Sequence, residues 1–296
     1  MKKLLSVDDL SDADLFRVFE LATDFKRSGI PRRRKGNWVL VFLEPSTRTR
    51  LSFERALRAL GFETYLFTAE ASSLKKGESL TDTFLTLRAQ GFEGVVVRTP
   101  KNGLAAELEG VDLRAINAGD GTNEHPTQAL VDAFTLREVF GKLEGLRVVF
   151  VGDAKYSRVF RSGVKLFKRL GMKVGVCGPR SLKPADLSLL GVDADFTSVD
   201  EALEWCDAAV FLRIQKERQS VPLITSERDY LKLFGLTPER AQYLRRSGKF
   251  YMHPGPVNRG VEVAPSEVYG KNSLILRQVE NGPFVRAAAV ELLYGE

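Results

Sequence analysis

Hydroxyl and guanidinium side chains are concentrated in one short run, residues 45–50 (Pro-Ser-Thr-Arg-Thr-Arg). The run follows an apolar segment, residues 38–43, whose composition is typical of a buried strand. After it, apolar residues recur at helical spacing as far as Gly61, which is a natural helix end. A helix N-terminus provides free backbone N–H groups and the positive end of a dipole. The run therefore predicts a phosphate-binding turn.

A capped helix with two solvated arginines would also explain the same run. The other polar residues of the chain therefore have to distinguish between the two interpretations. Polar side chains also follow the other expected strands. They are Arg98 as the last residue of strand 94–98, His125 and Gln128 after strand 113–117, Arg158 after strand 147–151, Arg213 and Gln215 after strand 208–212, and His-Pro-Gly-Pro (253–256) after strand 249–252. Taken alone, each of these side chains could have a purely structural role. Ligands of parallel sheets bind beyond the carboxyl ends of the strands, however, and cations at that edge favour ligands that carry phosphate and carboxylate groups.

The elements that must position these residues alternate between strand and helix, which indicates βαβ units and parallel sheets. One alternating set occupies the first half of the chain and a second set begins after a long helix over residues 126–141. We therefore expect an α/β fold of two doubly wound domains, each a parallel sheet flanked by helices, bridged by two helices. The expected domains are residues 1–130, completed by a C-terminal helix over residues 277–296, and residues 131–276. The apolar pattern places the start of that last helix at Pro283.

Composition limits the alternatives. The chain has 296 residues, a net charge of +6, two cysteines and two histidines, which leaves little for a zinc site or a disulfide framework. We expect buried thiols, no metal and a cytoplasmic protein without a membrane span. Residues 149–153 resemble a dinucleotide-binding turn, but Ala154 and Ser157 replace its later glycines, which argues against a nucleotide cofactor. A basic nucleic-acid-binding protein is a further alternative, disfavoured because the arginines are spaced singly at strand ends.

Two motifs give the chain a resemblance to a known family. Residues 45–50, followed by Ser52-Phe53-Glu54, resemble the carbamoyl-phosphate signature of the transcarbamoylases, and residues 125–130 (His-Pro-Thr-Gln-Ala-Leu) resemble their second signature. Within the family, the chain is similar to the aspartate-specific members. It has residues 75–78 (Lys-Lys-Gly-Glu) and 213–218 (Arg-Ile-Gln-Lys-Glu-Arg), and it lacks the His-Cys-Leu-Pro motif of the ornithine enzymes. A transcarbamoylase for another acceptor is the nearest alternative.

The resemblance implies a reaction and a set of site residues. The reaction is transfer of the carbamoyl group from carbamoyl phosphate to the amine of L-aspartate, in de novo pyrimidine biosynthesis. The implied catalytic residues are Thr49, Lys76, Arg98 and His125. The implied carbamoyl-phosphate ligands are Ser46, Thr47, Arg48, Thr49, Ser72, Arg98, His125, Gln128, Gly255 and Pro256. The implied L-aspartate ligands are Lys76, Arg158, Arg213 and Gln215.

The resemblance also implies a homotrimer with shared active sites. In the family, the residues that correspond to Ser72 and Lys76 reach the site of a neighbouring subunit, and Ser73 is an alternative to Ser72. No metal and no cofactor are implied, and neither nucleic acid nor a membrane is an expected partner. The sequence does not choose among free trimers, assemblies with regulatory chains and complexes with a dihydroorotase.

Overall fold

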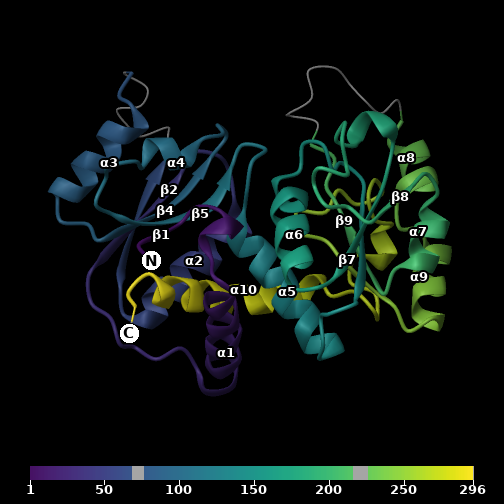
Figure 1. The fold of residues 1–296 in the computed structure, drawn as a ribbon, viewed down its shortest axis with the longest axis horizontal. Helices are drawn as coiled ribbons and strands as arrows, with labels where there is room; N and C mark the ends of the chain where they lie inside the picture. The colour runs from purple at the N-terminus through teal and green to yellow at the C-terminus, as the bar shows by residue number, and fades with distance from the viewer. Residues whose placement is uncertain (69–76, 216–225, 296) are drawn as a thin grey trace. The chain divides into compact units, whose positions relative to one another are not determined.

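The computed structural model describes residues 1–68, 77–215 and 226–295. The chain divides into two compact units, one formed by Met1–Phe134 with Val279–Glu296 and the other by Thr135–Gln278. Both divisions fall within helices, α5 (Pro126–Phe140) and α10 (Ile275–Leu292), so two continuous helices run from one unit into the other. The expected α/β class with two parallel sheets and two bridging helices is confirmed (Figure 1).

The first unit contains a five-stranded parallel sheet. In spatial order its strands are β1 (Lys3–Leu4), β5 (Arg114–Asp120), β4 (Gly94–Thr99), β2 (Asn37–Phe42) and β3 (Glu63–Thr68). Its helices are α1 (Asp12–Ser28), α2 (Thr47–Leu60), α3 (Leu80–Ala89), the short α4 (Leu104–Glu107), the first part of α5 and the part of α10 from Val279 onward. Because β2 and β4 are covered on both faces, they consist of nearly continuous buried apolar residues.

The helix boundaries of the first unit follow local chemistry. Ser11 caps α1 in a capping box with Asp14, as the sequence predicts. Helix α2 ends at Gly61, whose φ of 111° lies in the left-handed region that glycine tolerates. Ser46 is the N-cap residue of α2, but its side chain makes no capping hydrogen bond. The hydroxyl at the start of α2 is therefore not used to satisfy the helix that carries it.

The second unit contains another five-stranded parallel sheet. Its strands in spatial order are β10 (Phe250–Met252), β9 (Ala208–Phe211), β6 (Arg147–Val151), β7 (Lys173–Cys177) and β8 (Ala194–Phe196). Its helices are α6 (Arg158–Arg169), α7 (Val199–Trp205), α8 (Glu227–Phe234) and α9 (Pro238–Arg246). A core of buried apolar residues packs between this sheet and the helices, with Phe211 and Tyr251 among its largest members.

Two expected boundaries are wrong. Helix α10 begins at Ile275 rather than at Pro283, which lies inside the helix. An interior proline costs a hydrogen bond and creates a steric clash, but buried residues occur on both sides of it, including Ile275 and Val285, and their packing outweighs this cost. Strand β5 extends to Asp120, beyond the expected end at residue 117, because Asp120 pairs with Thr99 of β4.

Among the helices in the described ranges, even the longest lacks the apolar stretch that a bilayer crossing would need.

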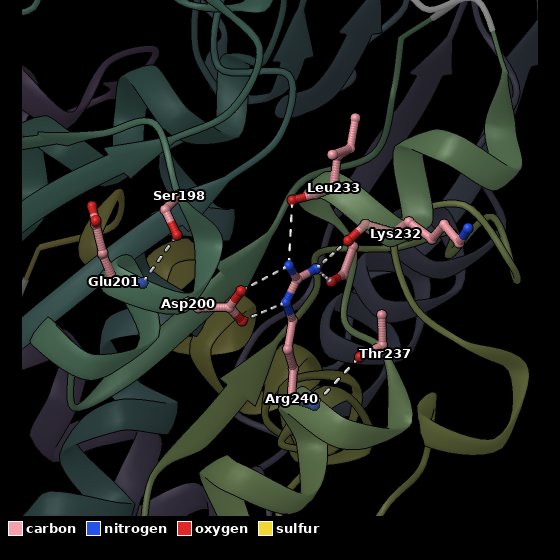
Figure 2. A network of polar contacts seen from close by, with 8 residues as sticks. Ser198, Asp200, Glu201, Lys232, Leu233, Thr237 and Arg240 are labelled. Atoms are coloured by element: carbon pink, nitrogen blue, oxygen red, sulfur yellow. Dashed lines mark hydrogen bonds and ion pairs between the residues drawn. The ribbon is translucent and has the colours of Figure 1, made fainter.

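Three helices of the second unit are tied together by Arg240 of α9. Figure 2 shows its guanidinium between the carboxylate of Asp200 on α7 and the carbonyl groups at the end of α8. Nε donates to Asp200 Oδ1 at 2.8 Å, and Nη1 donates to the carbonyl oxygens of Lys232 and Gly235 at 3.0 and 2.8 Å. The hydrogen bonds from Arg240 lower the pKa of Asp200 below its ordinary value. A cation at the last carbonyls also complements the dipole of α8.

We expect Arg240→Ala to destabilise the second unit by about 1–3 kcal/mol, because the last carbonyls of α8 lose their donors. Urea denaturation followed by circular dichroism measures the loss. The matched control is Arg246→Ala, an exposed arginine on the same helix, which should leave the transition unchanged. Equal effects of the two substitutions would contradict the anchoring role.

Candidate carbamoyl-transfer site

The turn between β2 and α2 has the form of an anion-binding site. Ser46 is half-buried, Thr47 is exposed and Thr49 is buried, and the first turn of α2 carries no acidic residue. No acidic side chain of this first turn therefore neutralises the positive end of the helix dipole. Ser46 and Thr47 line a hollow of about 310 Å³ together with Glu44 and Arg50. Free N–H groups, hydroxyls and arginine side chains in this arrangement suit a phosphate group.

Arg98 lies at the end of β4, the strand that pairs with β2, and Phe42 is its register partner. Its Nε donates to Oε1 of Glu44 at 2.7 Å, and both side chains are less than one-fifth exposed, at 17% and 18%. Glu44 holds the guanidinium at the sheet edge. Sequence analysis missed Glu44, although its position directly after the expected strand 38–43 was a signal that could have identified it.

The N-terminus of α5 supplies a third set of polar groups at this edge of the sheet, after the turn between β2 and α2 and Arg98. The carbonyl oxygen of His125 accepts the N–H groups of Gln128 and Ala129 at 3.0 and 3.3 Å, so the residue also begins the helix. The Gln128 amide nitrogen donates to Asp132 Oδ1 at 2.8 Å. This bond commits the nitrogen to the helix and leaves the amide oxygen as the acceptor available to a ligand.

The phosphate turn, Arg98 and the start of α5 therefore follow three neighbouring strands, β2, β4 and β5. The structure brings these predicted residues to one edge of the first sheet, as the topology argument expected. The roles assigned to individual residues remain predictions.

The second unit places a comparable set at the edge of its own sheet. Arg158 is the first residue of α6, is only 4% exposed and follows β6. Arg213 and Gln215 follow β9, the neighbour of β6, and Arg213 Nη2 donates to Gln215 Oε1 at 3.0 Å. Two arginines and an amide beyond adjacent strands suit a ligand with two carboxylates, because the guanidinium fork matches a carboxylate.

Two buried carboxylates position the segment that carries Arg213, and sequence analysis assigned neither a role. Asp153 Oδ2 accepts the N–H of Gln215 at 3.0 Å, and Glu262 Oε1 accepts the N–H of Ile214 at 2.9 Å. Asp153 and Glu262 are 0% and 1% exposed. Asp153 was detectable by its position just after β6, whereas Glu262 lies in an irregular segment and gave no signal.

The segment after β10 contains the remaining predicted residues. Gly255 has a φ of 70°, a conformation that favours glycine, and its N–H donates to Nδ1 of the buried His253 at 2.9 Å. The next residue, Pro256, is exposed. Ser72, its alternative Ser73, and Lys76 lie outside the described residues, as does the second part of the 213–218 motif.

Cysteine and metal chemistry have no support in the described part of the chain. Cys177 and Cys206 are free and buried, as expected, and burial raises the pKa of each thiol to about 12. Residues 1–68, 77–215 and 226–295 contain no group of three or more His, Cys, Asp and Glu side chains that could hold a metal ion.

Family models match both units. The model described as the carbamoyl-P binding domain of aspartate/ornithine carbamoyltransferase matches residues 2–138, and the model of the Asp/Orn binding domain matches residues 144–293.

The chain belongs to the aspartate/ornithine carbamoyltransferase family.

Curated members of this carbamoyltransferase family resemble the chain over its whole length. The aspartate carbamoyltransferase catalytic subunit of Aquifex aeolicus (strain VF5) is 47% identical, over 99% of this chain and 100% of the relative. The corresponding subunit of Chlorobium chlorochromatii (strain CaD3) is 41% identical, over 100% and 99%.

Solved carbamoyltransferase structures share the fold. The M. jannaschii catalytic subunit of aspartate transcarbamoylase has a TM-score of 0.83 at 31% identity, with 100% of both chains covered. Ornithine carbamoyltransferase from Thermus thermophilus has a TM-score of 0.86 at 26% identity, covering 99% of each chain. Because both kinds of enzyme fit the backbone equally well, the fold alone does not select the acceptor. Identity to the Aquifex subunit is much higher, and that difference points to aspartate.

We expect both thiols to resist modification in the folded protein. Their raised pKa leaves almost no thiolate at pH 8, and the thiolate is the reactive form. A chromogenic disulfide reagent should therefore report fewer than about 0.1 thiols per chain within minutes under native conditions, and two after denaturation. Rapid labelling of the native protein would contradict this burial.

Proposed function

We propose that this chain transfers the carbamoyl group of carbamoyl phosphate to the amine of L-aspartate, giving N-carbamoyl-L-aspartate and phosphate in pyrimidine biosynthesis. The observation that carries the proposal is the presence of two sheet edges rich in anion-binding groups, one in each unit. The first has a phosphate turn with Arg98, and the second has Arg158 and Arg213 beyond adjacent strands. The high identity to aspartate carbamoyltransferase catalytic subunits supports the choice of acceptor.

The edge of the first unit binds carbamoyl phosphate. Four consecutive residues hold the phosphate together with the N–H groups at the start of α2; these are Ser46, Thr47, Arg48 and Thr49. Arg98, His125 and Thr49 polarise the carbonyl oxygen. The Gln128 amide oxygen accepts a hydrogen bond from the carbamoyl NH₂. The hydrogen bond from Gln128 to Asp132 supports this orientation of the amide.

The edge of the second unit binds the acceptor. Arg158 pairs with the α-carboxylate of aspartate, and Arg213 with Gln215 binds the β-carboxylate. Ornithine has a cation where aspartate has its second carboxylate, so an arginine at that position would repel it. The buried carboxylates Asp153 and Glu262 fix the backbone of this segment, which supports a preorganised acceptor site.

The chemistry is a direct acyl transfer. The amine of aspartate attacks the carbamoyl carbon, a tetrahedral intermediate forms, and the C–O bond to phosphate breaks. Donors already in place around the carbonyl oxygen stabilise the negative charge that develops there. The departing phosphate accepts the proton that the amine loses. The proposed residues supply binding, orientation and charge stabilisation, and none of them acts as a general base.

The proposed assembly is a homotrimer in which Ser72 and Lys76 contribute to a neighbouring site, Lys76 toward L-aspartate. Self-association is supported by the edge strand β3, where Tyr65 and Leu66 are 47% and 50% exposed. Regulatory chains or a dihydroorotase are further candidate partners. The two free cysteines support a reducing, cytoplasmic location.

A ureido assay with purified protein, carbamoyl phosphate and three acceptors tests the proposal. We expect product with L-aspartate and none with L-ornithine or N-acetylornithine. Arg213→Ala should abolish turnover at moderate aspartate concentration, because the second carboxylate loses its partner. Arg246→Ala, an exposed change in the same unit, is the control. Activity with another acceptor alone would refute the roles of Arg158 and Arg213.

Arg98→Ala should reduce turnover by about 10²–10³-fold, the usual effect of removing one donor to a developing oxyanion. The effect of His125→Ala should be smaller, since it is one donor among several. Steady-state kinetics at saturating substrate concentrations measures the turnover of both variants. Arg88→Ala, which removes an arginine that is 50% exposed on α3, is the control. Full turnover by Arg98→Ala would exclude the proposed role.

A further inference from the structure

One residue, Asn258, holds both oxygens of the buried carboxylate of Glu262. Its backbone N–H donates to Oε2 at 2.7 Å, and its side-chain Nδ2 donates to Oε1 at 2.8 Å. Hydrogen bonds to both oxygens from a single residue fix the plane of the carboxylate, as in other bidentate arrangements. Glu262 is 1% exposed, so these bonds lie in a low dielectric, where they are stronger than in water.

The oriented carboxylate also holds the segment proposed to bind the acceptor. Oε1 accepts the N–H of Ile214 at 2.9 Å, and Ile214 is fully buried. Its chain neighbours are Arg213 and Gln215, which we propose as ligands of the second carboxylate of aspartate. The direction in which Glu262 points its Oε1 therefore sets the backbone from which Arg213 extends.

The backbone of Glu262 is anchored separately from its side chain. Its N–H donates to the carbonyl oxygen of Asn258 at 3.3 Å, and its carbonyl oxygen accepts the N–H of Leu236 at 2.9 Å. The first bond closes a turn over residues 258–262, and the second fastens that turn to the connection between α8 and α9. The carboxylate is therefore presented from a fixed base, and Asn258 determines its direction.

The segment after β10 reaches the same carboxylate through His253. This residue is 2% exposed, and its Nδ1 accepts the N–H of Gly255 at 2.9 Å, so the neutral ring carries its hydrogen on Nε2. Nε2 lies 3.7 Å from Glu262 Oε2. One carboxylate thus lies against both the segment after β9 and the segment after β10, which follow neighbouring strands.

We propose that Asn258 is a positioning residue for the acceptor: it orients the Glu262 carboxylate, which in turn places Arg213 for the second carboxylate of aspartate. The inference rests on the proposed function and names the residue that preorganises its acceptor site. Asn258 touches no substrate in this account. Its loss weakens the binding of dicarboxylates, because the segment must then be ordered when the ligand arrives. The phosphate site of the first unit is unaffected.

Asn258→Ala tests the proposal, because it removes the Nδ2 donor and keeps the backbone N–H. We expect the KM for L-aspartate to rise about tenfold, near the lower end of what a hydrogen bond to a charged group contributes, and kcat to stay within about twofold. The inhibition constant of succinate, which has both carboxylates and no amine, should rise by about the same factor. That of inorganic phosphate should stay within about twofold, since it binds in the first unit.

Arg259→Ala is the matched control. Arg259 is exposed and belongs to the same turn, but its side chain contacts the carbonyl oxygen of Pro265 and the ring of Tyr269 rather than Glu262. It should leave both KM values unchanged. Equal effects of the two substitutions, or a loss of kcat in Asn258→Ala with an unchanged KM for L-aspartate, would overturn the positioning role.

Asn258→Asp adds a pH profile and decides the question if Asn258→Ala fails to fold. The introduced carboxyl group faces Glu262 Oε1, and two carboxylates at that distance cannot both be ionised, so they share a proton at low pH and keep the contact. As the pH rises the pair loses that proton, and repulsion turns Glu262 away from Ile214. The ratio of variant to wild-type KM for L-aspartate should rise from within about twofold near pH 6 to about tenfold near pH 8.5.

Taking the ratio to the wild type removes the contributions of other titratable groups beside Glu262, which are His253, Asp153 and Tyr230. Burial, with the charges of Glu262 and Asp153, raises the pKa of Tyr230 well above its ordinary value, so it stays neutral throughout. A ratio that does not change with pH would overturn the positioning role. A wild-type protein that makes no N-carbamoyl-L-aspartate would refute the proposed function instead, so the two failures are distinguishable.

Discussion

The parallel pairing of β5, β4 and β2 is the constraint on which the first unit depends. Parallel hydrogen bonding aligns the carboxyl ends of the strands, so the segments that leave them all begin at one edge. The phosphate turn, Arg98 and the start of α5 come from three separate parts of the sequence, yet the sheet assigns them one position. The second sheet does the same for Arg158 and Arg213 through the pairing of β6 with β9.

Carboxylates hold the polar groups at the carboxyl ends of the strands in both sheets. Glu44 holds Arg98, Asp153 and Glu262 hold the backbone beside Arg213, and Asp132 holds Gln128. Without these acidic partners, the arginine and amide side chains would be mobile, and the arginines would repel one another. Buried or half-buried acidic partners fix their geometry before a ligand arrives, which reduces the reorganisation that binding requires. Each of these polar groups, which we propose to bind the substrates, is thus held by an acidic residue.

Much of the fold was predictable because its signals are local. The strand at 147–151 has the predicted bounds, and β4, β9 and β10 differ from the predicted ranges by one residue at one end, since each is a short run between turn residues. Short elements with weak patterns, such as β8 and α9, were not predicted. The start of α10 was wrong because Pro283 is a strong local signal against a helix interior, and only packing on both sides of it overrides that signal.

The sequence by itself determined the residues that are proposed to bind the ligand, because their types, their order and their positions at strand ends are local properties of the chain. It also determined the family, since two long motifs in the correct order are specific. Only the tertiary structure decided which acidic residues position those side chains. Glu44 and Arg98 are 54 residues apart, Asp153 and Gln215 are 62 apart, and Arg286 reaches Ser52 across 234. No local pattern encodes contacts at such separations. They exist only once the sheets are paired and α10 packs in the first unit.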